Sequence, residues 1–172
     1  PYGLEMEESW NIGLNLTHTI KLGGKDLTIS LDGYHTRFEN QVIVDLEDPR
    51  LVKFYNLEGK SFSNSLQFQA EFSPLKSLDL RIAYRFNDAK TTFSGELMEK
   101  PLSAKHRAFI NAAYSTSNGW KFDATLNWQG KKRIPDTNSN PEIYRLEAWS
   151  KGYFLLNAHI SKAWKEKFEL YI

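Results

Sequence analysis

Apolar and polar residues alternate along much of this chain with a period of two. In residues 119–130, GWKFDATLNWQG, polar side chains separate the apolar ones at Trp120, Phe122, Ala124, Leu126 and Trp128. Because successive residues of a β-strand point to opposite faces of a sheet, this alternation predicts a strand with one apolar and one polar face. The apolar face must meet either a protein core or lipid.

The same alternation recurs in seven further segments: residues 9–20, 26–44, 66–72, 78–87, 107–114, 152–163 and 168–172. Together the eight segments predict an all-β protein, an antiparallel up-and-down meander of about eight strands. Around Gly33 the alternation loses its phase, and we expect a β-bulge there. Segment 152–163 is weaker in phase, and its expected apolar set is Phe154, Leu156, Ala158 and Ile160.

The connections between the predicted strands alternate strictly between short and long. The short ones are LGGKD, SPLKS, TSNG and WKEK, and the long ones contain ENQVIVDLEDPRLVKFYN, DAKTTFSGELMEKPLSAK and GKKRIPDTNSNPEIYRLEAWSKG. A transmembrane β-barrel has tight turns at one rim and long loops at the other, whereas a soluble meander has no reason to sort its hairpins this way. The pattern therefore favours lipid at the apolar face and a lumen at the polar face.

Aromatic residues make up 14% of the chain and lie mostly near the two ends of the predicted strands. This placement is typical of the two interfacial girdles of a membrane barrel, with an aliphatic band of about 25 Å between them. We therefore expect twelve side chains to face lipid: Trp10, Leu14, Phe68, Phe72, Ile82, Tyr84, Ile110, Tyr114, Trp120, Phe122, Leu126 and Trp128.

Charge and composition exclude several classes of protein. The chain has 172 residues, with 22 Lys and Arg against 21 Asp and Glu, and its net charge of +1 argues against a dedicated nucleic-acid binder. It contains no cysteine, which excludes disulfides, thiolate zinc sites and thiol nucleophiles. The chain lacks a run of about 18 apolar residues, so no transmembrane helix is predicted. The search for such runs hardly detects membrane strands, in which apolar and polar residues alternate.

The direction of the predicted strands bears on the extent of the barrel. The first strand runs into the short LGGKD connection, and the last begins after WKEK and ends at Ile172. Small complete barrels usually begin at the rim with the short turns, so neither end suits a finished barrel of eight strands. We expect further strands on both sides.

Several segments resemble one family of membrane proteins. EESWNIGLNL, LTISLDGYHTRFENQV, SLQFQAEFSPLKSLDLRIAYRFNDAKT, KHRAFINAAY and FLLNAHISKAWKEKFELYI are similar to the later barrel strands of TonB-dependent outer-membrane receptors, especially those of Bacteroidetes. The resemblance covers nearly the whole chain and rests on a diffuse pattern. It implies a 22-stranded barrel closed by an N-terminal plug, of which this chain, residues 1–172, would be about strands 14 to 21. The plug, the TonB-contacting segment (TonB box), the early strands and the closing strand would lie outside it.

The resemblance also implies a function. It predicts active uptake through the cell outer membrane, driven by TonB, of a scarce ligand such as a siderophore, haem, cobalamin, metal complex or glycan. The expected partners are outer-membrane lipid, the protein's own plug domain, TonB and the small-molecule ligand or glycan, with no nucleic acid and no cofactor.

Two groups of residues are candidates for contacts with partners. The expected lumen or plug contacts are the polar-face residues Gln67, Gln69, Glu71, Arg81, Arg85, Arg107, Lys121 and Asp123. Any water-filled lumen is lined by such residues, so each taken alone is weak evidence. The candidate ligand loop, residues 130–152, contains Arg133, Tyr144, Arg145 and Trp149. Solvated loops commonly have this composition.

The sequence gives no sign of catalysis. It contains no phosphate-binding loop, nucleophile elbow or metalloprotease motif, and its four histidines, His18, His35, His106 and His159, are single and lack metal-ligand spacing. We therefore expect no enzyme and no metal site. Three alternatives remain: a soluble ligand-binding or carbohydrate-binding sandwich, an outer-membrane barrel enzyme and a passive porin. The sandwich predicts that Trp120, Phe122, Leu126 and Trp128 are buried between two sheets.

Overall fold

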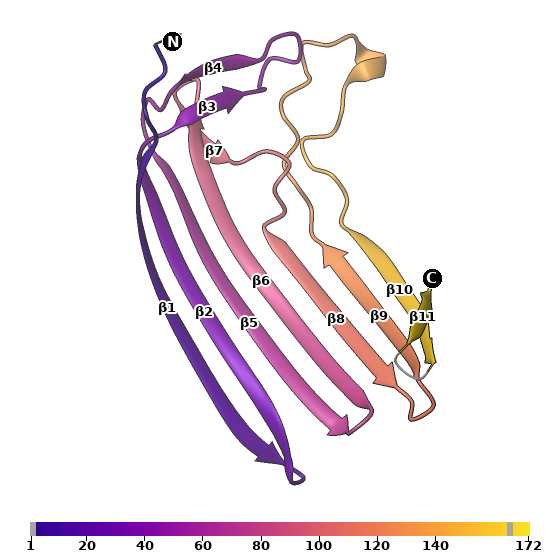
Figure 1. Cartoon of the computed structure of the whole chain (residues 1–172). Helices are drawn as coiled ribbons and strands as arrows, with labels where there is room; N and C mark the ends of the chain where they lie inside the picture. Colours follow the sequence, from indigo (N-terminus) through magenta and orange to yellow (C-terminus); the bar gives the residue numbers. More distant parts are fainter. Residues whose placement is uncertain (1–2, 165–166) are drawn as a thin grey trace.

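The computed structural model describes residues 3–164 and 167–172, and eight strands of this part of the chain form a continuous antiparallel sheet (Figure 1). Each strand pairs with the next one along the path, so the predicted meander of about eight strands is confirmed. The strands are β1 (Glu8–Leu22), β2 (Lys25–Asn40), β5 (Ser61–Leu75), β6 (Leu78–Phe93), β8 (His106–Ser115), β9 (Trp120–Gln129), β10 (Tyr153–Trp164) and β11 (Phe168–Tyr171).

Tight turns lie at one end of the sheet and long connections at the other (Figure 1). The β1–β2 turn consists of Gly23 and Gly24, whose φ angles of 59° and 78° give the two positive values that a type I′ hairpin requires. Short turns also join β5 to β6 and β8 to β9. The fourth short connection includes residues 165–166, which lie outside the described residues. The alternation of connection lengths thus places all three long connections at one rim.

Continuous pairing divides the sheet into an apolar and a polar face. Partners in neighbouring strands lie on the same face, so the register defines rows that cross the whole sheet. One apolar row is Leu16, Leu31, Phe68, Tyr84, Ala108, Trp128 and Phe154. A polar row on the other face is Asn15, Asp32, Gln67, Arg85, Arg107, Gln129 and Tyr153.

The prediction of a β-bulge at Gly33 is wrong. Gly33 pairs with Leu14 on one side and Leu66 on the other without a shift, and the irregularity of this pair of strands lies instead at Glu8 and Ser9. The sequence loses its phase because the polarity of the two faces reverses beyond Gly33. From there to the long-loop end, Tyr34 and Phe38 lie on the otherwise polar face, and His35 and Arg37 on the otherwise apolar one.

The long connections carry small elements of their own (Figure 1). The predicted strand 26–44 ends at Asn40, and β3 (Val42–Asp45) pairs with β4 (Lys53–Asn56) in a separate hairpin. β7 (Glu96–Glu99) pairs with the end of β6, and a single 3₁₀ turn, η1, spans Glu142–Tyr144. Most of the buried side chains of the described residues lie at this rim, among them Ile43, Phe93 and Ala104.

The apolar face of the sheet is uncovered within the described residues. Trp120, Phe122 and Leu126 are 40%, 40% and 41% exposed, and the second sheet, β3–β4, lies at the long-loop rim (Figure 1). The sandwich alternative requires these side chains to be buried between sheets, so the structure does not favour it.

Residues 3–164 and 167–172 contain no helix with the length and apolarity needed to cross a bilayer.

Candidate functional site

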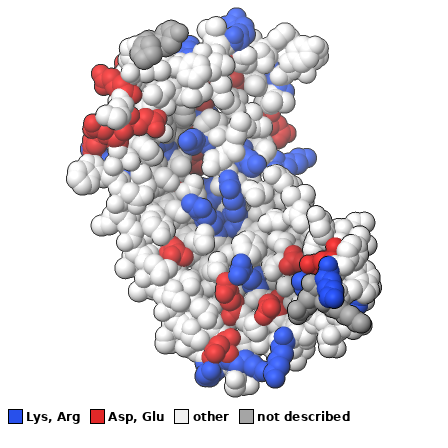
Figure 2. Space-filling view, viewed as in Figure 1, with Lys and Arg blue, Asp and Glu red and all other residues white. Residues whose placement is uncertain are grey.

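All eight residues predicted to line a lumen or contact a plug lie on the polar face. Gln67, Gln69 and Glu71 alternate on β5, and Arg81 and Arg85 lie on β6. Arg107 on β8 continues the row of Gln67 and Arg85, and Lys121 and Asp123 lie on the same face of β9. Figure 2 shows a group of Lys and Arg side chains near the middle of one face, with acidic side chains above and below it.

Toward the short turns, the charged side chains of the polar face have ion-pair or hydrogen-bond partners within the sheet. The Arg81 Nε lies 2.9 Å from Glu71 Oε1, and Gln69 donates to the same carboxylate at 2.9 Å. Asn111 donates to both oxygens of Asp123 at 3.0 and 3.1 Å.

The two edge strands of this region follow the same rule. Lys121 lies 3.2 Å from Glu169, which also accepts a hydrogen bond from Ser161 at 2.9 Å. Lys21 forms an ion pair with Asp26 beside the β1–β2 turn. Each strand cation in this half of the polar face therefore has an acidic partner.

Arg85 and Arg107 differ from this pattern, and we refer to them as the arginine pair. They are direct cross-strand partners, so two like charges lie opposite each other. The Arg85 Nε donates to Ser65 Oγ at 3.1 Å, and no acidic side chain among the described residues forms an ion pair with either arginine. Both arginines line a cavity of about 200 Å³ together with Gln67, Asn127 and Gln129.

Beyond the arginine pair, toward the long-loop rim, the three long connections contact one another. We call them the loop cluster (residues 41–60, 94–105 and 130–152). Its central contact is a bidentate ion pair in which Arg133 donates to the two oxygens of Glu47 at 2.6 and 2.9 Å. The same guanidinium donates to the Glu99 carbonyl at 2.6 Å. With side chains only 12% and 14% exposed, Arg133 and Glu47 join all three connections.

A second contact of the loop cluster surrounds the buried carboxylate of Asp45. Tyr55 donates to it at 2.7 Å, Ser94 Oγ at 2.9 Å and the Glu47 N–H at 2.9 Å. Burial alone would raise the pKa of Asp45, but these three donors stabilise the charged form and hold its pKa below the ordinary value. Asp45 is thus a charged residue that fixes the β3–β4 hairpin to the β6–β7 turn.

Lys105 forms a third contact, between the loop cluster and the end of β6. Its ammonium lies 2.8 Å from Asp88 and 2.9 Å from Glu99. Hydrogen bonds to Asp88 and Glu99 raise the pKa of Lys105 above its usual range.

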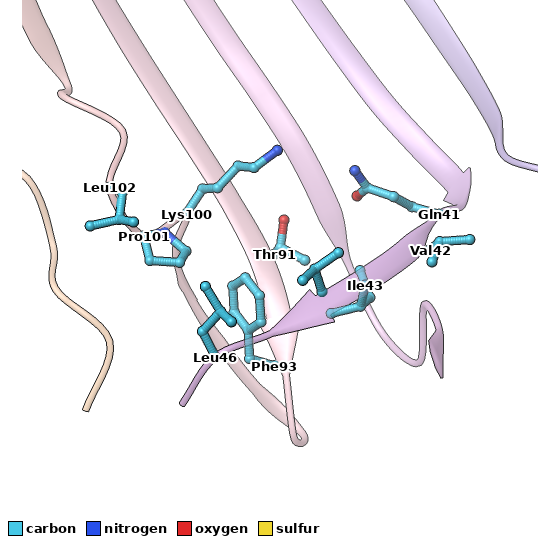
Figure 3. A pocket seen from close by; sticks show the side chains of 10 residues that line it. Gln41, Val42, Ile43, Leu46, Thr91, Phe93, Lys100, Pro101 and Leu102 are labelled. Carbon is cyan, nitrogen blue, oxygen red and sulfur yellow. The ribbon is translucent and has the colours of Figure 1, made fainter. Parts of the chain in front are cut away.

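An apolar pocket of about 210 Å³ opens within the loop cluster (Figure 3). Figure 3 shows Phe93 and Leu46 on one side and the polar ends of Lys100 and Gln41 on the other. Lys100 and Gln41 also line a polar cavity of about 400 Å³, to which Arg85 contributes on the sheet side. Apolar pocket, polar cavity and arginine pair therefore follow one another from the loop cluster down to the sheet. An arrangement of this kind can bind a ligand.

The four candidate ligand residues of segment 130–152 do not converge on one site. Arg133 forms an ion pair with Glu47, and its backbone forms an isolated β-bridge with Trp149. The Lys131 ammonium lies over the Trp149 ring, 4.6 Å from the ring centroid. Tyr144 is exposed on η1, and Arg145 donates to the Asn140 carbonyl at 3.0 Å. The sequence interpretation missed Glu47, Glu99, Asp45 and Lys100, because contacts between loops far apart in the chain leave no periodic signal.

The histidines are dispersed over the sheet. His106 contacts the Tyr84 hydroxyl at 2.7 Å, His35 lies 2.7 Å from Asn64, and His159 packs against Tyr171. Residues 3–164 and 167–172 contain no group of three or more His, Asp or Glu side chains arranged to hold a metal ion.

Comparison with known proteins agrees with this architecture. The sequence matches the family model described as TonB dependent receptor-like, beta-barrel, over residues 1–172. No curated protein matches the chain. Among solved structures, the crystal structure of the ferric-catecholate import receptor Fiu from E. coli K12, in its closed form, is similar with a TM-score of 0.63 at 13% identity. The likeness covers 93% of this chain and 22% of the Fiu chain, and at this identity it shows the fold alone.

Proposed function

Because the chain belongs to the TonB-dependent receptor-like β-barrel family, we propose that it forms part of the wall and outer loops of an active transporter in the cell outer membrane. The observation that carries this proposal is the division of the sheet into two faces. One face is apolar and uncovered, as a lipid-facing wall requires, and the other is polar and bears charges that suit a lumen.

The arrangement of the sheet supports a barrel segment. β1 and β11 are the edges of the sheet, and no other described strand pairs with their outer sides. We assign the chain to about strands 14 to 21 of a 22-stranded barrel, with further strands pairing at both edges and an N-terminal plug filling the lumen. Barrel closure removes the two exposed edges, which would otherwise favour aggregation.

The apolar face, the polar face and the loop cluster have different roles in the proposed transporter. The twelve apolar residues from Trp10 to Trp128 that were predicted to face lipid hold the wall in the membrane. The polar face contacts the plug or the solute that passes it. The loop cluster covers the lumen from outside and supplies the apolar pocket beside Lys100.

The proposed cargo is a scarce solute too large for passive pores, of the siderophore, haem, cobalamin, metal-complex or glycan class. Fiu is named as an import receptor for ferric catecholates, which is one member of this range. Capture by the loops and plug is followed by release when TonB pulls on the plug through the TonB box, using energy from the inner membrane. No bond is made or broken, so the proposed protein is a transporter and not an enzyme.

Expression of the full-length protein in hosts with and without TonB tests this function. We expect the protein in the outer-membrane fraction, and uptake of at least one solute class only in the host that has TonB. Equal uptake in both hosts would favour the passive porin. A protein that is monodisperse without detergent would contradict the membrane assignment.

A further inference from the structure

The ion pairs of the polar face single out the arginine pair. Of the strand cations on this face, Lys21, Arg81 and Lys121 each have an acidic partner within 3.2 Å. Within the described residues, Arg85 and Arg107 are the two strand cations on this face that lack one, and the register places them side by side. The unbalanced positive charge of the face is therefore concentrated at one point.

The surroundings of the arginine pair offer hydrogen bonds without negative charge. In the row that runs through the pair, Gln67 and Gln129 lie on its two flanks, and Asn127 and Asn87 line the adjoining cavities. The nearest acid of the row, Asp32, is two strands from Arg85, or about 10 Å at the usual spacing of strands. Asp32 already accepts a hydrogen bond from Asn15 at 2.6 Å.

Like charges placed directly opposite each other destabilise an antiparallel pair of strands. The Nε of Arg85 is held by Ser65, which leaves its terminal nitrogens free to donate. Two guanidinium groups can present parallel N–H donors to the oxygens of one carboxylate or phosphate, and such charge-assisted bonds are about twice as strong as neutral ones. An oxyanion between Arg85 and Arg107 would remove their repulsion.

We propose that Arg85 and Arg107 bind a single oxyanionic group, of the carboxylate or phosphate class, on the lumen side of the sheet beneath the loop cluster. This inference rests on the proposed function, because it takes the polar face to be the lumen. Cavities of about 110 and 200 Å³ beside the pair are large enough for one such group. Lys100 borders the adjoining cavity with Arg85, so positive charge extends from the loop cluster to the pair.

The anionic group can come from the solute or from an acidic side chain of the plug. Binding of inorganic phosphate to the full-length receptor in detergent, measured by calorimetry at constant ionic strength, tests the first source. Hydrogen exchange of the plug in the same protein tests the second. The variant is Arg85→Gln/Arg107→Gln, and the control is Arg37→Gln/Arg50→Gln, which removes the same net charge from the opposite face and from an exposed loop.

If the solute supplies the anion, phosphate binds the wild type and the control at least about tenfold more tightly than the arginine-pair variant. If the plug supplies it, the wild type does not bind phosphate, and the arginine-pair variant alone loses protection in the plug. Should that variant fail to fold, Arg85→Lys/Arg107→Lys provides the same test with a smaller loss, because lysine lacks the bidentate geometry.

The inference is overturned if neither phosphate affinity nor plug protection separates the arginine-pair variant from the control. That result would leave the proposed function intact wherever uptake still depends on TonB. Absence of the protein from the outer membrane would instead defeat the proposed function itself.

Discussion

The loop cluster and the sheet below it differ in where their stability comes from. Ile43 and Asp45 of the loop cluster are buried within the described chain, as is Phe93 at the adjoining end of β6, and Arg133 joins three connections. Within that same part of the chain, the sheet has backbone pairing but almost no core, since large apolar side chains on one face are uncovered. The loop cluster is thus stabilised by its own contacts, whereas the sheet depends on what surrounds it, which the proposed function identifies as lipid and plug.

A charge placed on the apolar face should cause the largest loss of stability, because the sheet depends on lipid at that face. Leu156→Arg places a cation in the middle of β10, beside Leu126, and we expect a loss of about 2–4 kcal/mol in unfolding free energy in lipid vesicles. Asn157→Arg, the next residue on the opposite face, is the control and should cost little. Denaturant unfolding of the full-length receptor measures both variants, and equal losses would show that the two faces meet the same environment.

Removal of the central ion pair should instead affect the loop cluster alone. Arg133→Gln leaves Glu47 without its bidentate partner, and we expect about 2 kcal/mol of lost local stability, below the roughly 3–5 of a fully buried pair. Hydrogen exchange should rise in residues 41–60, 94–105 and 130–152 and stay unchanged in β8 and β9. Arg145→Gln, in the same connection but exposed, should change neither region.

Acid should weaken the loop cluster through Asp45. The pKa of Asp45 is lowered in the folded protein, so its contribution is present above the ordinary carboxyl pKa of about 4 and is lost as the pH falls through the folded value. We expect exchange protection of β3 and β4 to drop below about pH 4. In Asp45→Asn this drop in protection at low pH should be smaller. Exchange protection of β3 and β4 at neutral pH should already be lower than in the wild type, by about 1 kcal/mol. A drop of the same size in wild type and variant would show that Asp45 does not cause it.

The smallest effect is expected at an exposed ion pair of the polar face. Arg81 and Glu71 have side chains 53% and 42% exposed, and such pairs contribute less than about 1 kcal/mol. Arg81→Gln should therefore leave the unfolding midpoint of the receptor nearly unchanged. A loss as large as that of Arg133→Gln would remove the distinction between the loop cluster and the sheet.

The sequence alone predicts the sheet well, because its signal is local. A period of two assigns the faces, tight turns such as Gly23–Gly24 set the register of their hairpins, and the resemblance to TonB-dependent receptors is confirmed at the level of the family. The Bacteroidetes type and the strand count of 22 stay predictions. The mistaken bulge at Gly33 arose because a change in the environment of a strand and a change in its register look alike in a sequence.

The candidate site is less predictable for a physical reason. The pairing of Lys21 with Asp26 follows from the two-glycine turn between β1 and β2, whereas that of Arg85 with Arg107 crosses a connection whose length leaves the register open. Contacts such as Glu47 with Arg133 span 86 residues and depend on how three loops fold together. Such contacts emerge only when the loops are placed in space.

The central claim is that lipid meets the apolar face of this sheet. Single cysteines placed in turn at residues 122 to 127, in a chain segment that has no cysteine of its own, can carry spin labels in the full-length receptor in lipid vesicles. We predict that labels at Phe122, Ala124 and Leu126 are accessible to oxygen from the bilayer, and that labels at Asp123, Thr125 and Asn127 are accessible to a water-soluble nickel chelate. Uniform accessibility along β9, or access of the chelate to the first three positions, would contradict the account.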